Sequence, residues 1–312
     1  MILTLTPNPA LDLTYRIDAL QPGETHRVSA GPARAGGKGI NVARVLHTQG
    51  FPVRAVLTAG GATGAQVVAD LQESGIAHEA VPVGSPTRRT IAVVEDGDGT
   101  TTLLSESGAA LSEDERARLH AAVQSPLPIA SCLVISGSLP AGFPPEEIAA
   151  MVASSRSRGI PVIVDTSGPA LLAAAAAGAD LLKPNAAELA EATGERDLAA
   201  GAQALLDLGA DTVLVSLGEE GMLAAHSASA WTRAALPRVL RGNPTGAGDA
   251  GVAAAAMLLA QGAPTAADLL RAATSWSAAA VLMPLAGEIS RTHRELAVEV
   301  ALHPYPDSEE RP

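Results

Sequence analysis

Hydrophobic residues occur along this chain in short runs that alternate with stretches of helical periodicity. The apolar runs predict strands at 2–6, 53–58, 132–136, 161–165, 180–184 and 212–217. The stretches between them predict helices at 38–49, 63–74, 112–124, 145–158, 169–177 and 197–208. Runs of four to six apolar residues are typical of strands that are buried on both faces of a parallel sheet. The pattern therefore predicts an α/β fold with helices on both sides of a predominantly parallel sheet.

Two segments break this rhythm, because apolar and polar residues alternate in them. Residues 10–34 alternate around the turn QPGE, and residues 86–105 alternate around DGDG, which is a strong hairpin signal. Such alternation predicts strands with only one covered face. We expect both segments to form one small sheet that projects as a lid over a site or as a dimer contact. The alternative is two unrelated surface hairpins.

The C-terminal third is predicted to be mostly helical, over 247–261, 265–284 and 290–302. A charged, proline-rich tail (HPYPDSEERP) follows from residue 303 and is expected to fray.

Composition and net charge exclude several classes of function and say less about the fold. The 312 residues suit one large domain with an appendage, and 47% hydrophobic against 17% charged residues argues against disorder. A net charge of −12 argues against nucleic acid or an anionic membrane as partner. The single cysteine, Cys132, lies in an apolar run and is expected to be a buried structural thiol. The N-terminus lacks a basic region, and no apolar run approaches about 18 residues, so a cytoplasmic location is expected.

The stretch RGNPTGAGDAG (241–251) contains the spacing G-x-G-x-x-G at Gly246, Gly248 and Gly251. This spacing is the fingerprint of NAD-dependent oxidoreductases, which need a second strand that ends in an acid about 20 residues later. Asp268 has that spacing, but it lies in a segment with helical periodicity. The βαβ unit is therefore missing, and the oxidoreductase interpretation is rejected.

A glycine loop that opens a helix remains at this place. Gly246, Ala247 and Gly248 leave backbone amides sterically open at the positive end of the helix dipole, where an anion binds. Asp249 would repel that anion unless it accepts a proton from an alcohol that attacks a phosphoryl group. The motif favours a phosphotransferase over a helix start whose acid only complements the dipole.

A second glycine loop, GGKGINVA (36–43), also opens a helix. Gly36 and Gly37 permit close backbone approach, and Lys38 and Asn41 add a cation and an amide in the first turn. The two loops together suit a hydroxylated, anionic ligand.

The pair GGKGINVA (36–43) and NPTGAGDA (243–250) resembles the two signatures of the ribokinase-like, PfkB-type carbohydrate kinases. Further motifs match in the same order: TPNPALD (6–12), SGSLPAG (136–142), VDTSG (164–168), KPNAAEL (183–189) and SLGEEG (216–221). The resemblance covers nearly the whole chain. It is strongest to the sugar-phosphate branch, which contains 1-phosphofructokinase, tagatose-6-phosphate kinase and the minor 6-phosphofructokinase.

The resemblance implies a three-layer α/β/α nucleotide domain made of residues 1–9, 35–85 and 106–312. Residues 10–34 and 86–105 would form the β-sheet lid, which in such proteins often also makes a homodimer. ATP and Mg²⁺ are the implied cofactors, and a phosphosugar is the implied substrate. Asp249 would be the catalytic base, with the amides of Gly246, Ala247 and Gly248 as an anion hole.

The resemblance also assigns binding residues. Sugar hydroxyls would be bound by Asp12, Gly36, Gly37 and Asn41, and the acceptor's phosphate by Lys38, Arg88 and Ser138. The nucleotide would be bound by Lys183, Ser216, Gly218, Gly221 and Ser277. Asn185 and Glu188 would organise Mg²⁺ through water. The residues taken alone favour another interpretation for that pair, a helix cap and a first-turn acid.

The lid departs from the family pattern in two places. The chain reads Thr87-Arg88-Arg89-Thr90-Ile91-Ala92 where T-R-x-N-V-K is usual, and SESG (105–108) where N-E-x-G is usual. We expect a ketohexose phosphate of the fructose 1-phosphate or tagatose 6-phosphate type as acceptor. The alternatives are fructose 6-phosphate, an unphosphorylated sugar or nucleoside, and a non-catalytic sugar- or nucleotide-sensing module.

Overall fold

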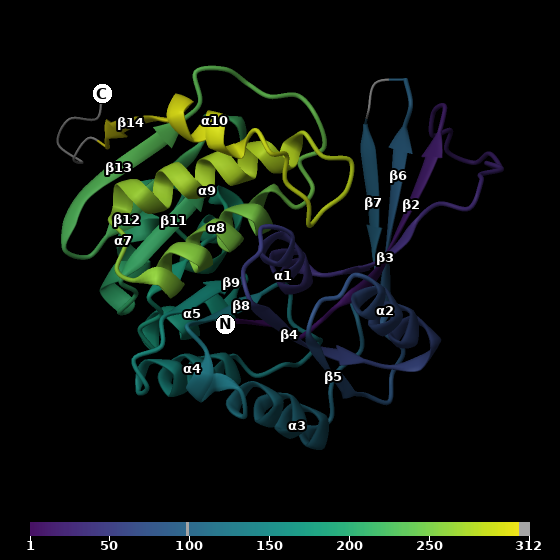
Figure 1. The fold of residues 1–312 in the computed structure, drawn as a ribbon, viewed down its shortest axis with the longest axis horizontal. Helices are drawn as coiled ribbons and strands as arrows, with labels where there is room; N and C mark the ends of the chain where they lie inside the picture. Colours follow the sequence, from purple (N-terminus) through teal and green to yellow (C-terminus); the bar gives the residue numbers. More distant parts are fainter. Residues whose placement is uncertain (98–99, 306–312) are drawn as a thin grey trace.

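The computed structural model describes residues 1–97 and 100–305, and it contains two sheets (Figure 1). The large sheet has ten strands in the order β14-β13-β12-β11-β10-β9-β8-β1-β4-β5. Its strands are β1 (Ile2–Thr6), β4 (Val53–Ala59), β5 (His78–Pro82), β8 (Cys132–Ser136), β9 (Val162–Asp165), β10 (Leu181–Leu182), β11 (Thr212–Ser216), β12 (Met222–His226), β13 (Ser229–Ala235) and β14 (Ala301–Pro304). The strands from β5 to β11 are parallel, as the continuous apolar runs predict, and β12, β13 and β14 extend the sheet in antiparallel fashion.

Helices cover both faces of the large sheet, so that two hydrophobic cores form. One layer contains α1 (Lys38–Thr48), α2 (Gly61–Glu73), α8 (Ala247–Gln261), α9 (Ala266–Val281) and α10 (His293–Glu299). The other contains α3 (Glu113–Gln124), α4 (Pro145–Arg156), α5 (Pro169–Ala176), α6 (Ala186–Thr193) and α7 (Leu198–Leu208). In β8, Cys132 and Val134 point into the first core, whereas Leu133 and Ile135 point into the second. Cys132 is fully buried, as expected of a structural thiol, and burial raises its pKa.

The small sheet is formed by four strands in the order β3-β2-β6-β7. They are β2 (Ala10–Ile17), β3 (Ala33–Gly36), β6 (Arg88–Glu95) and β7 (Thr101–Ser105). The two alternating segments thus pair with each other, through parallel contacts between β2 and β6, and are not two unrelated hairpins. The sheet projects beside the large one (Figure 1). The DGDG turn falls partly on residues 98–99, which lie outside the described residues; the domain boundaries stay a prediction.

The glycine loop before α8 is followed by two consecutive helices, as the rejection of the dinucleotide fold requires. Asp268 lies in the first turn of α9. Its carboxylate accepts a hydrogen bond from the Thr265 amide at 3.0 Å, and its own amide donates to the Thr265 hydroxyl at 3.1 Å. The acid at the fingerprint spacing is therefore half of a capping box.

The predicted helix over 290–302 is wrong at both ends. α10 covers only His293–Glu299, and Ala301–Pro304 form β14, which pairs with β13. The hairpin of β12 and β13 and the edge strand β5 were not predicted from the sequence. β12 reads MLAAH, whose alanines do not favour a strand, so its pairing with β11 decides its conformation. Of the tail that was expected to fray, residues 306–312 lie outside the described residues. Within the described chain, no helix is both long enough and apolar enough to cross a membrane.

Candidate active site

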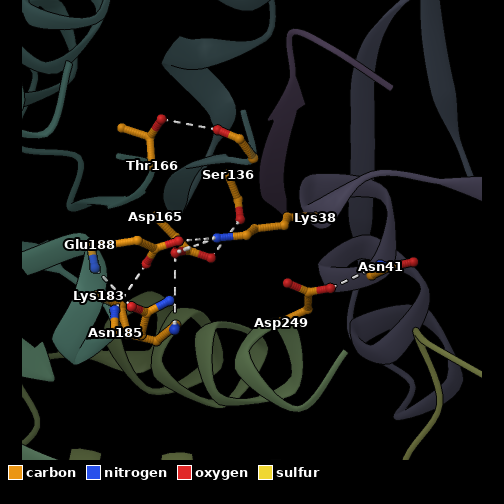
Figure 2. Close-up of polar contacts among 10 residues, drawn as sticks. Lys38, Asn41, Ser136, Asp165, Thr166, Lys183, Asn185, Glu188 and Asp249 are labelled. Atoms are coloured by element: carbon orange, nitrogen blue, oxygen red, sulfur yellow. Dashed lines mark hydrogen bonds and ion pairs between the residues drawn. The ribbon is translucent and has the colours of Figure 1, made fainter. Parts of the chain in front are cut away.

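Polar side chains gather where the parallel strands of the large sheet end. Ser136 and Asp165 are the last residues of β8 and β9, and Lys183 directly follows β10. The helices α1 and α8 begin at the same edge, and Figure 2 shows their residues Lys38, Asn41 and Asp249 beside this group. The carboxyl ends of parallel strands are where α/β proteins bind ligands.

The backbone conformation and the close packing at the start of α8 require glycine. Gly246 has a left-handed backbone (φ +84°), and a Cβ atom there would lie 2.9 Å from Ala286. The Ala247 amide donates to the Pro244 carbonyl at 3.1 Å, and the first i→i−4 bond runs from Ala250 to Gly246. The amide of Ala247 is thus engaged, unlike the free donor expected from the sequence. The amides of Gly248 and Asp249 are left as first-turn donors that helix geometry cannot satisfy.

A cation stands beside these amides. A Cβ atom at Gly248 would lie only 3.3 Å from the Nζ atom of Lys183, so glycine permits the close approach. Lys183 is buried, with 4% of its side chain exposed. An ammonium and two backbone amides at the positive end of a helix dipole are the donors that an anion requires.

Asp249 lies in the first turn of α8 and is only 6% exposed. Its Oδ2 atom accepts a hydrogen bond from the Nδ2 atom of Asn41 at 2.8 Å (Figure 2). Burial, together with the charge of Asp165, raises the pKa of Asp249 to about 6, against the opposing effects of Asn41, Lys38 and Lys183. The site therefore contains an oriented carboxylate that is ionised at neutral pH and holds a proton more readily than an exposed aspartate.

Asp165 is a central residue to which the sequence analysis gave no role. It is fully buried, and its carboxylate accepts hydrogen bonds from Ser136 Oγ at 3.1 Å and Lys38 Nζ at 3.3 Å. Lys183 Nζ lies 3.9 Å from the same Oδ1 atom. Burial alone would raise the pKa of Asp165, but the two lysines hold it below the usual value. Its signal is visible in VDTSG, where an acid closes an apolar core strand.

Lys38 lies among acids. Its Nζ atom is 3.3 Å from Asp165 Oδ1 and 3.3 Å from Glu188 Oε1 (Figure 2). Burial opposes the charge of Lys38, yet Asp165 and Glu188 raise its pKa above the usual value. The family resemblance assigns Lys38 to the acceptor's phosphate, whereas this structure shows it bound on the side of Glu188.

Asn185 and Glu188 form a capping box at the start of α6. The Glu188 amide donates to Asn185 Oδ1 at 2.8 Å, and the Asn185 amide donates to Glu188 Oε2 at 2.9 Å. This is the cap and first-turn acid that the residues alone favoured. It leaves Glu188 Oε1 directed toward Lys38.

The described residues contain no cluster of three or more His, Cys, Asp or Glu side chains that could hold a metal ion. Asp165 and Glu188 do offer two carboxylates around one point, since both contact the same ammonium nitrogen. Mg²⁺ in nucleotide sites is usually held by one or two carboxylates together with substrate phosphates and waters. These two carboxylates fit a magnesium ion that is also bound by phosphate groups. They do not fit an ion that is held by protein side chains alone.

The lid supplies a separate group around Asp12. A Cβ atom at Gly36 would lie 1.9 Å from Asp12 Oδ2, so glycine lets the Asp12 carboxylate lie against the backbone of β3. Burial raises the pKa of Asp12 to about 6, although Thr90 donates a hydrogen bond to it. Arg34 from β3 pairs with Glu288 at 2.9 Å and so ties the lid to the loop after α9.

These residues border a cavity of about 100 Å³ between the lid and the core. Asp12, Arg34 and Thr90 line it from the lid, and Asn41 and Asn243 line it from the core. Asn41 lines this cavity and also hydrogen-bonds Asp249, so the cavity lies next to the side chain that holds the buried carboxylate.

Arg88 is the first residue of β6 and lies where the small sheet joins the core. Its Nη1 atom donates to Ser105 Oγ at 2.8 Å and to the Glu106 carbonyl at 3.1 Å, and its Nε donates to the Asn8 carbonyl at 3.2 Å. The Nδ2 atom of Asn8 donates in turn to Ser138 Oγ at 3.2 Å. The structure thus brings Arg88 and Ser138, two residues assigned to the acceptor's phosphate, to one place through Asn8.

A hollow of about 670 Å³ lies on the other side of α8. Gly218, Gly221, Ser277 and Ala247 line it, together with aliphatic side chains of 236–240 and of α9. Ser277 Oγ is buried and has no hydrogen-bond partner among the described residues. Ser216 lies at the end of β11, where it bridges to Asn185. Three of the residues predicted to bind nucleotide therefore share this hollow, and Ser216 and Lys183 lie between it and the lid side.

This chain is similar to known proteins over nearly its whole length. Residues 6–292 match the family described as pfkB family carbohydrate kinase. The chain is 36% identical to a 1-phosphofructokinase of Xanthomonas campestris, over 88% of this chain and 89% of the relative. It is 33% identical to the ATP-dependent 6-phosphofructokinase isozyme 2 of Mycobacterium tuberculosis, over 97% and 90%. The structure of the tetrameric inhibited form of phosphofructokinase-2 from Escherichia coli superimposes with a TM-score of 0.87 at 33% identity, over 95% and 98%.

Proposed function

Because this chain belongs to the pfkB family of carbohydrate kinases, we propose that it transfers the γ-phosphoryl group of ATP to a hydroxyl of a ketohexose phosphate. The observation that carries this proposal is the buried carboxylate of Asp249 in the first turn of α8, held by Asn41, a side chain that lines the cavity between the small sheet and the core. Family membership makes the chain an enzyme, so the alternative of a non-catalytic sensing module is set aside.

In the proposed reaction, Asp249 takes the proton of the acceptor hydroxyl as its oxygen attacks the γ-phosphorus. The bond between that phosphorus and the bridging oxygen of ADP breaks, and the proton on Asp249 is later released to solvent. Asn41 orients the carboxylate through its 2.8 Å hydrogen bond. The amides of Gly248 and Asp249 and the ammonium of Lys183 are placed to stabilise the charge on the transferring group.

The acceptor is proposed to lie in the cavity between lid and core. Asp12, the backbone at Gly36 and Gly37, and Asn41 offer the acceptors and donors that sugar hydroxyls need. Arg88 and Ser138 would hold the phosphate of the acceptor, since a guanidinium matches phosphate geometry. The names of the relatives support a fructose phosphate, and the fructose 1-phosphate or tagatose 6-phosphate type is proposed ahead of fructose 6-phosphate.

ATP is proposed to occupy the hollow beside Ser277, with its phosphates directed toward Lys183. The aliphatic part of its lining suits adenine, and Arg238 and Arg241 add positive charge. Gly218 and Gly221 allow close backbone approach. Asp165 and Glu188 would hold Mg²⁺ together with the phosphates. The bound metal would supply positive charge that neutralises the phosphate oxygens.

The acceptor is tested by measuring ADP release with fructose 1-phosphate, tagatose 6-phosphate, fructose 6-phosphate, and unphosphorylated sugars and nucleosides. We expect the highest kcat/KM with one of the first two. Activity confined to unphosphorylated acceptors would contradict the phosphosugar assignment, and activity with none would contradict the proposed function.

Arg88→Ala is expected to raise the KM of the acceptor about tenfold to a hundredfold, because a charge-assisted hydrogen bond is lost. The KM of ATP should change much less. Arg89→Ala is the matched control, since this neighbouring side chain is exposed and the residue contacts Glu106 through its backbone amide and carbonyl, which the substitution keeps. Equal effects of Arg88→Ala on both KM values would contradict the assignment of Arg88 to the acceptor's phosphate.

The dependence of kcat/KM for the acceptor on pH should show a steep acid limb. Asp249 must be ionised to take a proton, and ionised Asp12 binds hydroxyls more strongly, and both have pKa values raised to about 6 by burial. As pH falls through about 6, both acids become protonated and activity is lost with a slope approaching two. Asp12→Asn should reduce the slope by one, and this difference is informative because the acceptor's own phosphate titrates equally for both proteins. An unchanged slope of the acid limb in Asp12→Asn would show that protonation of Asp12 does not limit activity.

Self-association through the lid stays a prediction. Leu103 and Leu104 of β7 are exposed large hydrophobic residues on that sheet, which supports it.

A further inference from the structure

Lys38 is shared by two acids in this structure. Its Nζ atom lies 3.3 Å from Asp165 Oδ1 and 3.3 Å from Glu188 Oε1 (Figure 2). The acids come from the ends of different elements, β9 and the first turn of α6. They share this ammonium at the point where their carboxylates would meet a metal ion.

Both oxygens of Glu188 are already engaged. Oε2 accepts the amide of Asn185 at 2.9 Å, which fixes the rotamer, and Oε1 accepts the ammonium of Lys38. Both oxygens of Asp165 are engaged as well, because its Oδ1 faces Lys38 and Lys183 and its Oδ2 accepts Ser136 Oγ. A divalent cation that approaches these carboxylates must therefore displace Lys38 or lie against it.

The two acids that would hold a metal already have counter-charges. Lys38 contacts both Asp165 and Glu188, and Lys183 faces Asp165. Asp249 adds a third negative charge near both lysines. A divalent cation alone would add positive charge a few ångströms from an ammonium, where repulsion is strong even at the effective dielectric constant of a protein surface. A nucleotide brings phosphates whose negative charge compensates the same cation.

The two lysines differ in freedom. The side chain of Lys183 is 4% exposed, whereas 37% of the Lys38 side chain is exposed. Lys38 also stands at the first position of α1, directly after Gly37, so its side chain extends from the edge of the site. The side chain of Lys38 can therefore break its contacts with Asp165 and Glu188 and contact a phosphate group instead.

We propose that Lys38 is an internal counter-ion which excludes a free divalent cation from the Asp165–Glu188 pair, so that the metal enters only together with phosphate groups. The inference rests on the proposed function for the identity of the phosphate-bearing ligand. It assigns Lys38 to the control of metal entry, in addition to any contact with substrate.

The test is a titration of the nucleotide-free protein with Mn²⁺, which prefers the same oxygen ligands as Mg²⁺. Free Mn²⁺ is measured by electron paramagnetic resonance. Lys38→Met should tighten Mn²⁺ binding on the order of tenfold or more, because the repelling charge is removed. Lys38→Arg keeps the charge and should bind Mn²⁺ as weakly as the wild type.

Two further variants locate the effect. Arg158→Met removes the same charge from an exposed side chain that precedes β9, at the opposite edge of the sheet, and should leave Mn²⁺ binding unchanged. Adding Glu188→Gln to Lys38→Met should abolish the gain. If Lys38→Met does not fold, as judged by circular dichroism, Lys38→Gln replaces it.

Folded Lys38→Met or Lys38→Gln protein that binds Mn²⁺ no more tightly than the wild type would overturn the inference, and so would a gain that survives Glu188→Gln. The titration contains no nucleotide and no sugar, so its outcome is separate from the acceptor assay. A failed acceptor assay with a positive titration would contradict the proposed function alone, and the reverse result would contradict the counter-ion alone.

Discussion

Asp249→Asn is expected to lower kcat by about 10²- to 10⁴-fold while it makes the protein more stable at neutral pH. Asparagine has nearly the same shape and still accepts the hydrogen bond of Asn41, but it cannot take a proton from an alcohol. The loss should appear in kcat far more than in the KM of ATP, since the hollow proposed for ATP lies on the other side of α8.

The gain in stability follows from the pKa of Asp249. Burial raises this pKa from 3.8 to about 6 in the folded protein. An acid with a higher pKa in the folded state destabilises that state at every pH above both values, here on the order of 3 kcal/mol. The penalty decreases as pH falls through about 6 and is gone below the unfolded value. The free energy of unfolding of Asp249→Asn should therefore exceed that of the wild type at pH 7.5, and the difference should shrink by pH 5.

Asp268→Asn is the matched control, because Asp268 is also a first-turn acid but caps an exposed helix end. Hydrogen bonds from Thr265 hold the pKa of Asp268 below its usual value, so this variant should lose stability and keep its turnover. Denaturant unfolding at several pH values and steady-state kinetics measure both quantities. Wild-type turnover in Asp249→Asn would contradict the assignment of Asp249 as the catalytic base.

Asp165→Asn is expected to destabilise the protein by about 3–5 kcal/mol, the usual effect of removing one partner from a buried ion pair. Lys183 is buried and would face an uncharged amide in place of a carboxylate. Lys38 would keep only Glu188 as its acid. We also expect kcat to fall about 10²-fold, because a displacement of an ångström in a group at the reacting centre has effects of that size.

A double-mutant cycle separates the ion pair from simple loss of packing. Lys183→Met in the Asp165→Asn background removes both charges, so the double variant should be more stable than the sum of the single losses predicts, by about 0.5–3 kcal/mol. Its activity should not recover. Asp211→Asn serves as control, since Asp211 is exposed and precedes β11 at the opposite edge. Strictly additive losses would show that Asp165 and Lys183 do not act as a pair.

The sequence by itself determined the core strands, most helices and both glycine loops. These features follow from local periodicity and from backbone freedom, as at Gly36, where any side chain would strike Asp12. Asp249 could also be proposed as a base from the sequence, because a carboxylate beside backbone amides that suit an anion would repel that anion unless it accepts a proton. The same local signals could not reveal β12, β13 and β14, since pairing with distant strands outweighs the weak preference of segments such as MLAAH.

Only the tertiary structure decided which charges meet. Lys38 lies 127 residues from Asp165 and 150 from Glu188 along the chain, and strand order alone brings the three together. Asp165 could not be assigned a role from the sequence, because the role of an acid at the end of a strand depends on its spatial neighbours, here Lys38 and Lys183. Hydrophobic patterns predict which residues are buried, but long-range electrostatic partners depend on how the carboxyl ends of the strands converge.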